Sequence, residues 1–261
     1  MPGRIDLART GAVTELRIAN PQKFNAMSLQ MWHDLLQHVR GLHVNPEIRV
    51  LLLRGEGDKA FVSGADISEF DKNRSAASGS AEYDQAVAEV QQALIEFPVP
   101  VVALIHGICY GGGLGLALSC DLRYGADTSR YRMPAARLGL GYGFEGIRRM
   151  VQVLGEQRVA DLFFTARVVD GPEAQRIGVV HAIWPAIELD ARVEEVVQQI
   201  AANAPLTVKL AKRAIRRAQP VASAQAAQEI EAGRRECLLS ADYAEGRKAF
   251  AEKRAPVFQG A

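Results

Sequence analysis

The sequence is poor in cysteine and contains no long apolar run. Its three cysteines, Cys109, Cys120 and Cys237, have no CxxC spacing, so neither a disulfide framework nor a zinc site is expected. No apolar stretch approaches the roughly 20 residues of a membrane span, and residues 1–9 lack the apolar stretch of a signal peptide. We therefore expect buried thiols, a cytoplasmic protein and no contact with a membrane.

An excess of charge of either sign is also absent. Lys and Arg together number 31 and Asp and Glu 30, which leaves a formal net charge of +1. No overall field therefore favours nucleic acid, and a polyanionic ligand would need a local basic patch. What the chain does have is 48% hydrophobic residues in 261, enough to bury the core of one large folded unit.

Strand-like and helix-like segments alternate through the first two thirds of the chain, which predicts an α/β fold. Small polar residues predict a loop over 75–80, and Ser28 is a plausible N-cap for the first helix. Strands are expected at residues 13–18, 49–54, 101–105, 122–124 and 131–133, and helices at 29–41, 83–97, 111–120 and 145–153.

The pattern changes to helices near residue 188. Helices are expected at residues 191–202, 206–218, 222–239 and 243–254. We therefore divide the chain into an α/β core, residues 1–195, and a helical subdomain, residues 196–261. No long linker marks this division.

Two glycine-containing turns follow predicted strands. The first is FVSGADI at residues 61–67, and the second is HGICYGGG at residues 106–113, which runs into a helix. Glycine lets a backbone approach a ligand closely, and a helix start presents free N–H groups to a negative oxygen. A glycine-rich turn of this kind, taken alone, is more often plain turn chemistry, and neither turn has the pattern of a nucleotide-binding loop.

Together these segments resemble the two signature blocks of the crotonase (enoyl-CoA hydratase/isomerase) superfamily. Asn25-Ala26, residues 169–174, residues 177–180 and the stretch from Glu245 to Phe258 follow in the family's order, so the resemblance covers nearly the whole chain. It implies a crotonase-like spiral of ββα turns with a C-terminal helical trimerisation subdomain. It also implies a homotrimer or dimer of trimers, and an acyl-CoA thioester substrate whose coenzyme A is part of the substrate, with no separate cofactor or metal.

The resemblance implies a site as well. The N–H groups of Ala65 and Gly112 would hold the thioester oxygen, whose negative charge grows in the transition state. Tyr142 is either a hydrogen-bond donor or wall of the acyl pocket, or a packed loop tyrosine. The positions that the resemblance assigns to substrate and coenzyme A binding are Lys23, Asn25, Ala26, Ser63, Gly64, Asp66, Ile67, Gly111, Lys253 and Phe258.

The chain departs from the family where the hydratases carry catalytic glutamates. Gly115 and Ala135 occupy those two positions, and Gly143 falls at the place of an acid used by some isomerases. The usual pair that activates water is therefore missing. Glu145 is the nearest remaining acid, and it is either a proton shuttle or a first-turn residue that complements a helix dipole.

Three functions stay open. One is a hydratase/isomerase type of enzyme that uses Glu145, and another is isomerisation, decarboxylation or thioester hydrolysis on the same fold. A third is a non-catalytic CoA-ligand or RNA-binding protein. The RNA-binding branch of the family carries lysines on the first helix, whereas residues 29–41 contain none. The basic run at residues 209–217 is interpreted as a solvated helix face, so no nucleic acid partner is expected.

Overall fold

The computed structural model describes residues 2–66, 77–217, 228, 232, 233, 235, 238–254, 256 and 257. Ile67, Cys237 and Phe258 lie outside the described residues, as does most of the helix expected at 222–239. The described elements are β1 (Arg4–Thr10), β2 (Val13–Ala19), η1 (Pro21–Lys23), α1 (Leu29–Leu42), β3 (Val50–Gly55), β4 (Ala60–Val62), α3 (Ala77–Glu96), β5 (Val101–Ile105), β6 (Ile108–Tyr110), α4 (Gly112–Ser119), β7 (Leu122–Ala126), β8 (Arg130–Arg132), η3 (Ala135–Leu138), α5 (Phe144–Leu154), α6 (Glu156–Thr165), β9 (Val169–Asp170), α7 (Gly171–Arg176), β10 (Ala182–Trp184), α8 (Ala186–Ala202), α9 (Pro205–Arg217) and α11 (Ala241–Ala251).

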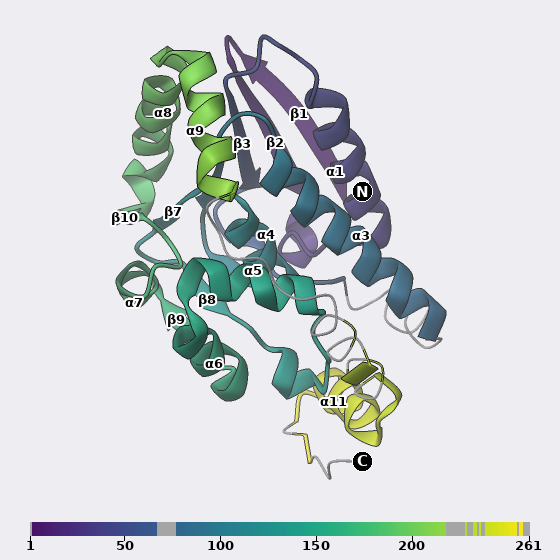
Figure 1. Cartoon of the computed structure of the whole chain (residues 1–261). Coiled ribbons are helices and arrows are strands. Elements are labelled where there is room, and N and C mark those ends of the chain that lie inside the picture. The colour runs from purple at the N-terminus through teal and green to yellow at the C-terminus, as the bar shows by residue number, and fades with distance from the viewer. Residues whose placement is uncertain are drawn as a thin grey trace.

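The strands form two sheets through which the chain spirals (Figure 1). The larger sheet has the order β1-β2-β3-β5-β7-β10, and the smaller one has the order β4-β6-β8-β9. Successive turns place β3, β5 and β7 in the first sheet and β4, β6 and β8 in the second, and each set pairs in parallel. Because parallel neighbours need crossover connections, α3 and α4 lie between successive turns. This arrangement is the spiral of ββα turns that was expected from the sequence.

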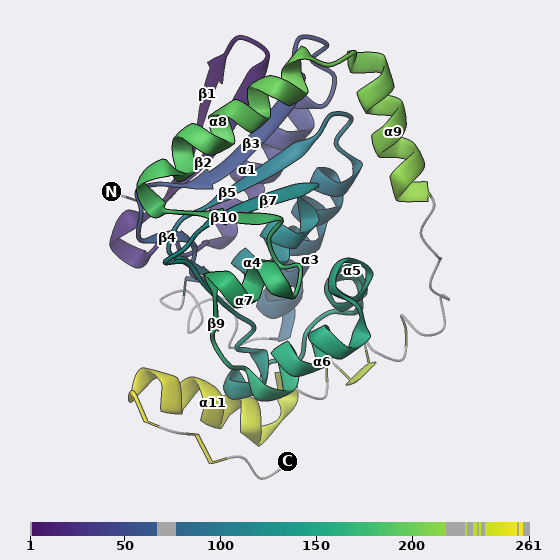
Figure 2. The same ribbon diagram turned by 90° about the vertical axis from the view of Figure 1, so that its left-hand side faces the viewer.

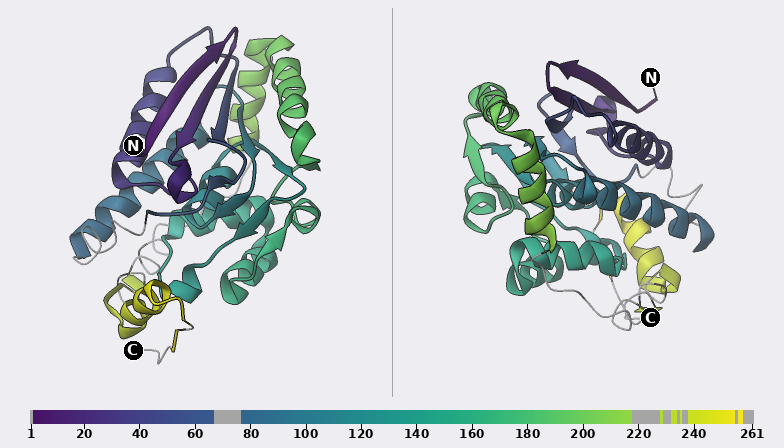
Figure 3. Two further views of the ribbon diagram at one scale, coloured as in Figure 1. Left: turned by 180° about the vertical axis from the view of Figure 1, so that it is seen from behind. Right: turned by 45° about the horizontal axis from the view of Figure 1, so that its top comes forward.

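Alternate side chains on the central strands pack into two separate cores. On β3, Leu51 and Leu53 pack into the core that contains α1, α3 and α4, whereas Val50 and Leu52 point to the other face. There they meet a row of buried residues on α8, which covers this face of the sheet in Figure 2. The two further views in Figure 3 show α1 and α8 on opposite sides of this sheet. Fully buried parallel strands are expected to be apolar on both faces, as this strand is.

Several expectations from sequence need correction. The loop predicted at residues 75–80 is wrong for 77–80, because α3 already begins at Ala77. The N-terminal strand β1 was not foreseen, although it pairs with β2 along its whole length. The N-cap at Ser28 is confirmed, since its hydroxyl accepts the N–H of Met31 at 3.1 Å.

The basic run on α9 is only partly a solvated face. Lys212 is buried, and its Nζ lies 2.7 Å from Asp121 and donates to the carbonyl of Val99. Arg216 pairs with the same carboxylate at 2.6 Å. These two cations therefore fasten α9 to the end of α4, which the spacing of charges in the sequence did not reveal.

The division after residue 195 falls inside α8, which continues without a break to Ala202. Leu189, Val193, Val197 and Ala201 on this helix all belong to the core against the six-stranded sheet. No helix in the described part of the chain combines the length and apolarity needed to cross a membrane.

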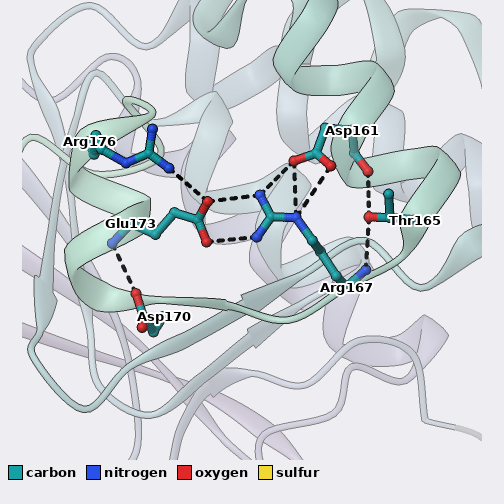
Figure 4. A network of polar contacts seen from close by, with 6 residues as sticks. All are labelled: Asp161, Thr165, Arg167, Asp170, Glu173 and Arg176. Carbon is teal, nitrogen blue, oxygen red and sulfur yellow. Dashed lines mark hydrogen bonds and ion pairs between the residues drawn. The ribbon is translucent and has the colours of Figure 1, made fainter.

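An ion-pair network holds the segment that the resemblance places at residues 169–174 (Figure 4). Arg167 pairs with both Asp161 of α6 and Glu173 of α7, each at 2.6 Å. Asp170 caps α7 by accepting the N–H of Glu173 at 2.9 Å. Hydrogen bonding to Arg167 lowers the pKa of both acids. This motif therefore has a structural role: it joins β9 to α6 and α7.

Candidate active site

The two glycine turns meet because α4 packs directly on β4. A Cβ added to Gly113 would fall 2.3 Å from the carbonyl oxygen of Val62, so no larger residue fits there. Gly111, the N-cap of α4, has φ 52° and ψ −118°, a conformation open only to glycine. The start of α4 is thereby held next to residues 63–66.

Backbone hydrogen bonds tie residues 63–66 to the loop before α1. The N–H of Ser63 donates to Phe24 at 3.1 Å, the N–H of Met27 to Gly64 at 2.9 Å, and the N–H of Asp66 to Met27 at 2.9 Å. The carboxylate of Asp66 lies 2.6 Å from Nζ of Lys23. Two loops far apart in sequence thus form one rigid wall.

Within this arrangement, the N–H groups of Ala65 and Gly112 have no acceptor among the described residues. Gly112 is the first residue of α4, so its N–H is one of those that a helix leaves unpaired. Both residues line a cavity of about 1610 Å³. Free donors at the edge of a large cavity are suited to hold a negatively charged oxygen.

Most of the residues expected at the site line this cavity. Those are Lys23, Ala26, Ser63, Gly64, Ala65, Asp66, Gly111, Gly112, Tyr142 and Glu145. Helix α11 forms another part of the wall through Tyr243, Arg247 and Phe250. This helix fits closely on η3, where a Cβ on Gly246 would lie 2.5 Å from backbone atoms of Leu138.

Asn25 and Lys253 do not line the cavity, which differs from expectation. The side chain of Asn25 is buried: its Oδ1 accepts the N–H of Asn20 at 3.0 Å, and its Nδ2 donates to the carbonyl of Ala60 at 2.7 Å. Its φ of 54° is one that asparagine tolerates well. Asn25 therefore shapes the loop that carries Lys23 and Ala26, rather than facing the cavity.

Ala135 and Gly115, the two positions at which the resemblance expects glutamate, have different surroundings. Ala135 is buried at the start of η3 and lines the cavity. Gly115 lies inside α4, and a Cβ built there would be 2.6 Å from Nε2 of Gln91 and 2.8 Å from the hydroxyl of Tyr142. These two side chains occupy the space into which a glutamate at position 115 would extend.

Tyr142 and Glu145 differ in environment. Burial raises the pKa of Tyr142 to about 12, so its hydroxyl stays protonated and able to donate. Glu145 lies in the first turn of α5, its side chain is 58% exposed, and it pairs with Arg148 one turn later. The residues that sequence reasoning missed are Gln91 and Asp84, which reach the cavity from α3. Neither residue belongs to a sequence motif. Each lines the cavity only because α3 packs beside it.

Comparison with known proteins identifies the family of the chain. The sequence matches the family described as Enoyl-CoA hydratase/isomerase over residues 8–261. The chain is 32% identical over 250 residues to the short-chain-enoyl-CoA hydratase of Clostridium acetobutylicum, covering 95% of this chain and 94% of that protein. It is 31% identical over 243 residues to the methylmalonyl-CoA decarboxylase of Escherichia coli, covering 92% and 91%.

A solved structure of methylmalonyl-CoA decarboxylase in complex with 2-nitronate-propionyl-CoA aligns with a TM-score of 0.88, at 29% identity and with 98% of both chains covered. The chain belongs to the enoyl-CoA hydratase/isomerase family, the crotonase superfamily of enzymes. Relatives at similar identity are named for different reactions, so the family leaves the particular reaction open.

Proposed function

We propose that the protein processes an acyl-CoA thioester through an enolate-like intermediate, whose oxygen is held by the N–H groups of Ala65 and Gly112. The observation that carries this proposal is that both donors are unpaired and border the same cavity. Preorganised donors act where negative charge develops, and they are worth most away from water. Coenzyme A takes part only as a portion of the substrate.

Hydration is not the reaction that this cavity favours. Gly115 and Ala135 supply no carboxylate to hold and deprotonate water, whereas forming an enolate requires only the oxyanion donors and one proton-transfer group or a leaving group. We therefore favour isomerisation or decarboxylation over water addition. Glu145, which borders the cavity, is our candidate for the proton-transfer group.

The proposed function is tested by exchange of α-hydrogens. A panel of acyl-CoAs incubated with the protein in deuterated water should include at least one that gains deuterium or is converted to product, as read by mass spectrometry. If no acyl-CoA on the panel gains deuterium or is converted, the proposal is contradicted and a protein with another ligand is favoured.

Glu145→Gln is expected to lower kcat on the true substrate at least roughly tenfold, because it keeps the shape of the side chain but removes the base. A matched control is Glu156→Gln, which changes the first-turn acid of α6 and does not line the cavity. Both variants lose a favourable helix-dipole contact, so their melting temperatures should fall alike. Equal rates in the two variants would leave Glu145 with a helix-start role only.

We also propose a homo-oligomer of at least three chains. Three apolar side chains on α9 are exposed in the single chain: Leu206 at 80%, Leu210 at 59% and Ile215 at 66%. Burying exposed apolar side chains of this kind against other copies is favourable. Light scattering at micromolar concentration should give three or more chain masses, and Leu210→Glu should lower that mass. A stable monomer would contradict this prediction.

A further inference from the structure

We propose that Gln91 and the basic groove beside it bind a carboxylate carried by the acyl group, so that the preferred substrates are CoA thioesters of short dicarboxylic acids. This inference rests on the proposed function, because it assumes that the thioester lies at Ala65 and Gly112.

The first observation is a buried donor with no acceptor. Gln91 on α3 is only 7% exposed, and its Nε2 makes no hydrogen bond of normal geometry within the described part of the chain. The side chain does lie close to the hydroxyl of Tyr142, where it partly offsets the rise in the pKa of Tyr142 that burial causes. Leaving a buried amide unsatisfied costs about 1–3 kcal/mol, so such a group calls for an explanation. Its N–H bonds need an acceptor such as a carboxylate oxygen, and Gln91 lines the cavity where that acceptor would sit.

The position of Gln91 fixes where the acceptor would lie along the substrate. Its Nε2 is 2.6 Å from the point where a Cβ on Gly115 would stand, and Gly115 follows Gly112 by three residues in α4. Three helical residues rise about 4.5 Å. The donor therefore lies a short distance beyond the thioester oxygen, which fits a carboxylate within a few carbons of the thioester.

The second observation is a groove of about 720 Å³ between α3, α5 and α9. Ala88, Gln91 and Glu145 line both this groove and the main cavity, so the two spaces adjoin at Gln91. Two acids, Glu96 and Glu145, face the groove. The basic residues that line it are Arg148, Arg149, Lys209, Lys212, Arg213 and Arg216.

Arg149 gives this groove its positive character. The residue is 8% exposed, and its Nε donates to the carbonyl of Leu118 at 2.8 Å, while its terminal nitrogens have no partner in the described residues. Burial, with the charges of Arg216 and Arg123 nearby, lowers the pKa of Arg149 to about 9. Asp121, the acid whose charge acts on Arg149, already pairs with Lys212 and Arg216. A buried cation of this kind is stabilised by an incoming anion.

The test compares acyl-CoAs of equal carbon number that differ only at their far end. Dissociation constants are measured by calorimetry for succinyl-CoA against butyryl-CoA and for glutaryl-CoA against pentanoyl-CoA. We expect the parent protein to bind at least one diacid thioester about tenfold more tightly than its partner, since a hydrogen bond to a charged group contributes that much.

Gln91→Met keeps the size of the side chain and removes the donor, so it should lose about tenfold in affinity for the diacid thioester alone. Gln91→Glu keeps the length and adds a negative charge, which should reverse the preference. Gln198→Met is the matched control, because Gln198 on α8 is exposed, bonds to Glu194 and lines neither the cavity nor the groove. It should bind like the parent.

Two results would overturn the inference: equal affinities within both pairs for the parent protein, or a loss in Gln91→Met that is the same for diacid and monoacid thioesters. The second result would assign Gln91 to packing. Because binding is measured without turnover, this outcome stays separate from the deuterium exchange that tests the proposed function.

Discussion

Gly112→Pro is expected to lower kcat on the acyl-CoA substrate by about 10²–10³-fold, because proline removes one of two N–H donors from the oxyanion. The substitution suits the backbone. Gly112 is the first residue of α4, where proline is well accepted, and a Cβ there meets only the ring of Trp32 at an ordinary 3.5 Å. The loss should therefore appear in the rate of a folded enzyme, measured by steady-state kinetics beside circular dichroism.

Gly112→Ala is the control for this variant, since it adds the same Cβ but keeps the N–H. It should retain most of the parent rate. If a folded Gly112→Pro protein is as fast as the parent, the oxyanion assignment is wrong. If the alanine and proline variants are equally slow, the contact with Trp32 is responsible rather than the missing donor.

Those parts of the site that depend on backbone conformation could be predicted from the sequence. Glycine at positions 64, 111 and 113 is required by positive φ or by close approach to β4, and such requirements leave a visible motif. The buried strands β3 and β5 were also found within a residue or two of their bounds, because Val50–Leu53 and Val101–Ile105 are continuous apolar runs. The family resemblance then supplied the spiral that joins them.

Side chains that act across long distances in sequence were not predictable in this way. The neighbours of Gln91 on α3, Gln92 and Glu89, look like ordinary surface residues in the sequence. Only the packing of α3 on α4 turns the side chain of Gln91 toward Gly115. Lys212 was interpreted as a solvated charge because its partner, Asp121, lies in the turn after α4 and is not close to it in sequence. Asn25 belongs to a motif, yet the motif did not indicate that the side-chain amide of Asn25 faces the protein interior.

Hydration of crotonyl-CoA is expected to be roughly 10²–10⁴-fold slower than in a hydratase that has both carboxylates, the range typical of a lost general acid or base. The assay follows loss of the enoyl absorbance, with the Clostridium acetobutylicum short-chain-enoyl-CoA hydratase as the reference enzyme. A rate equal to the reference would refute the argument from Gly115 and Ala135.

Restoring a single glutamate should not restore this activity. In Gly115→Glu the new Cβ would lie 2.6 Å from Gln91 and 2.8 Å from Tyr142, so both side chains must move. Overpacking of this kind costs about 1–3 kcal/mol of stability, which thermal unfolding would report. Adding Gln91→Ala opens space beside the new carboxylate, so the double variant should recover part of the lost stability and hydrate faster than Gly115→Glu alone. A fully stable single variant would show that the space at Gly115 is less tightly filled than the distances imply.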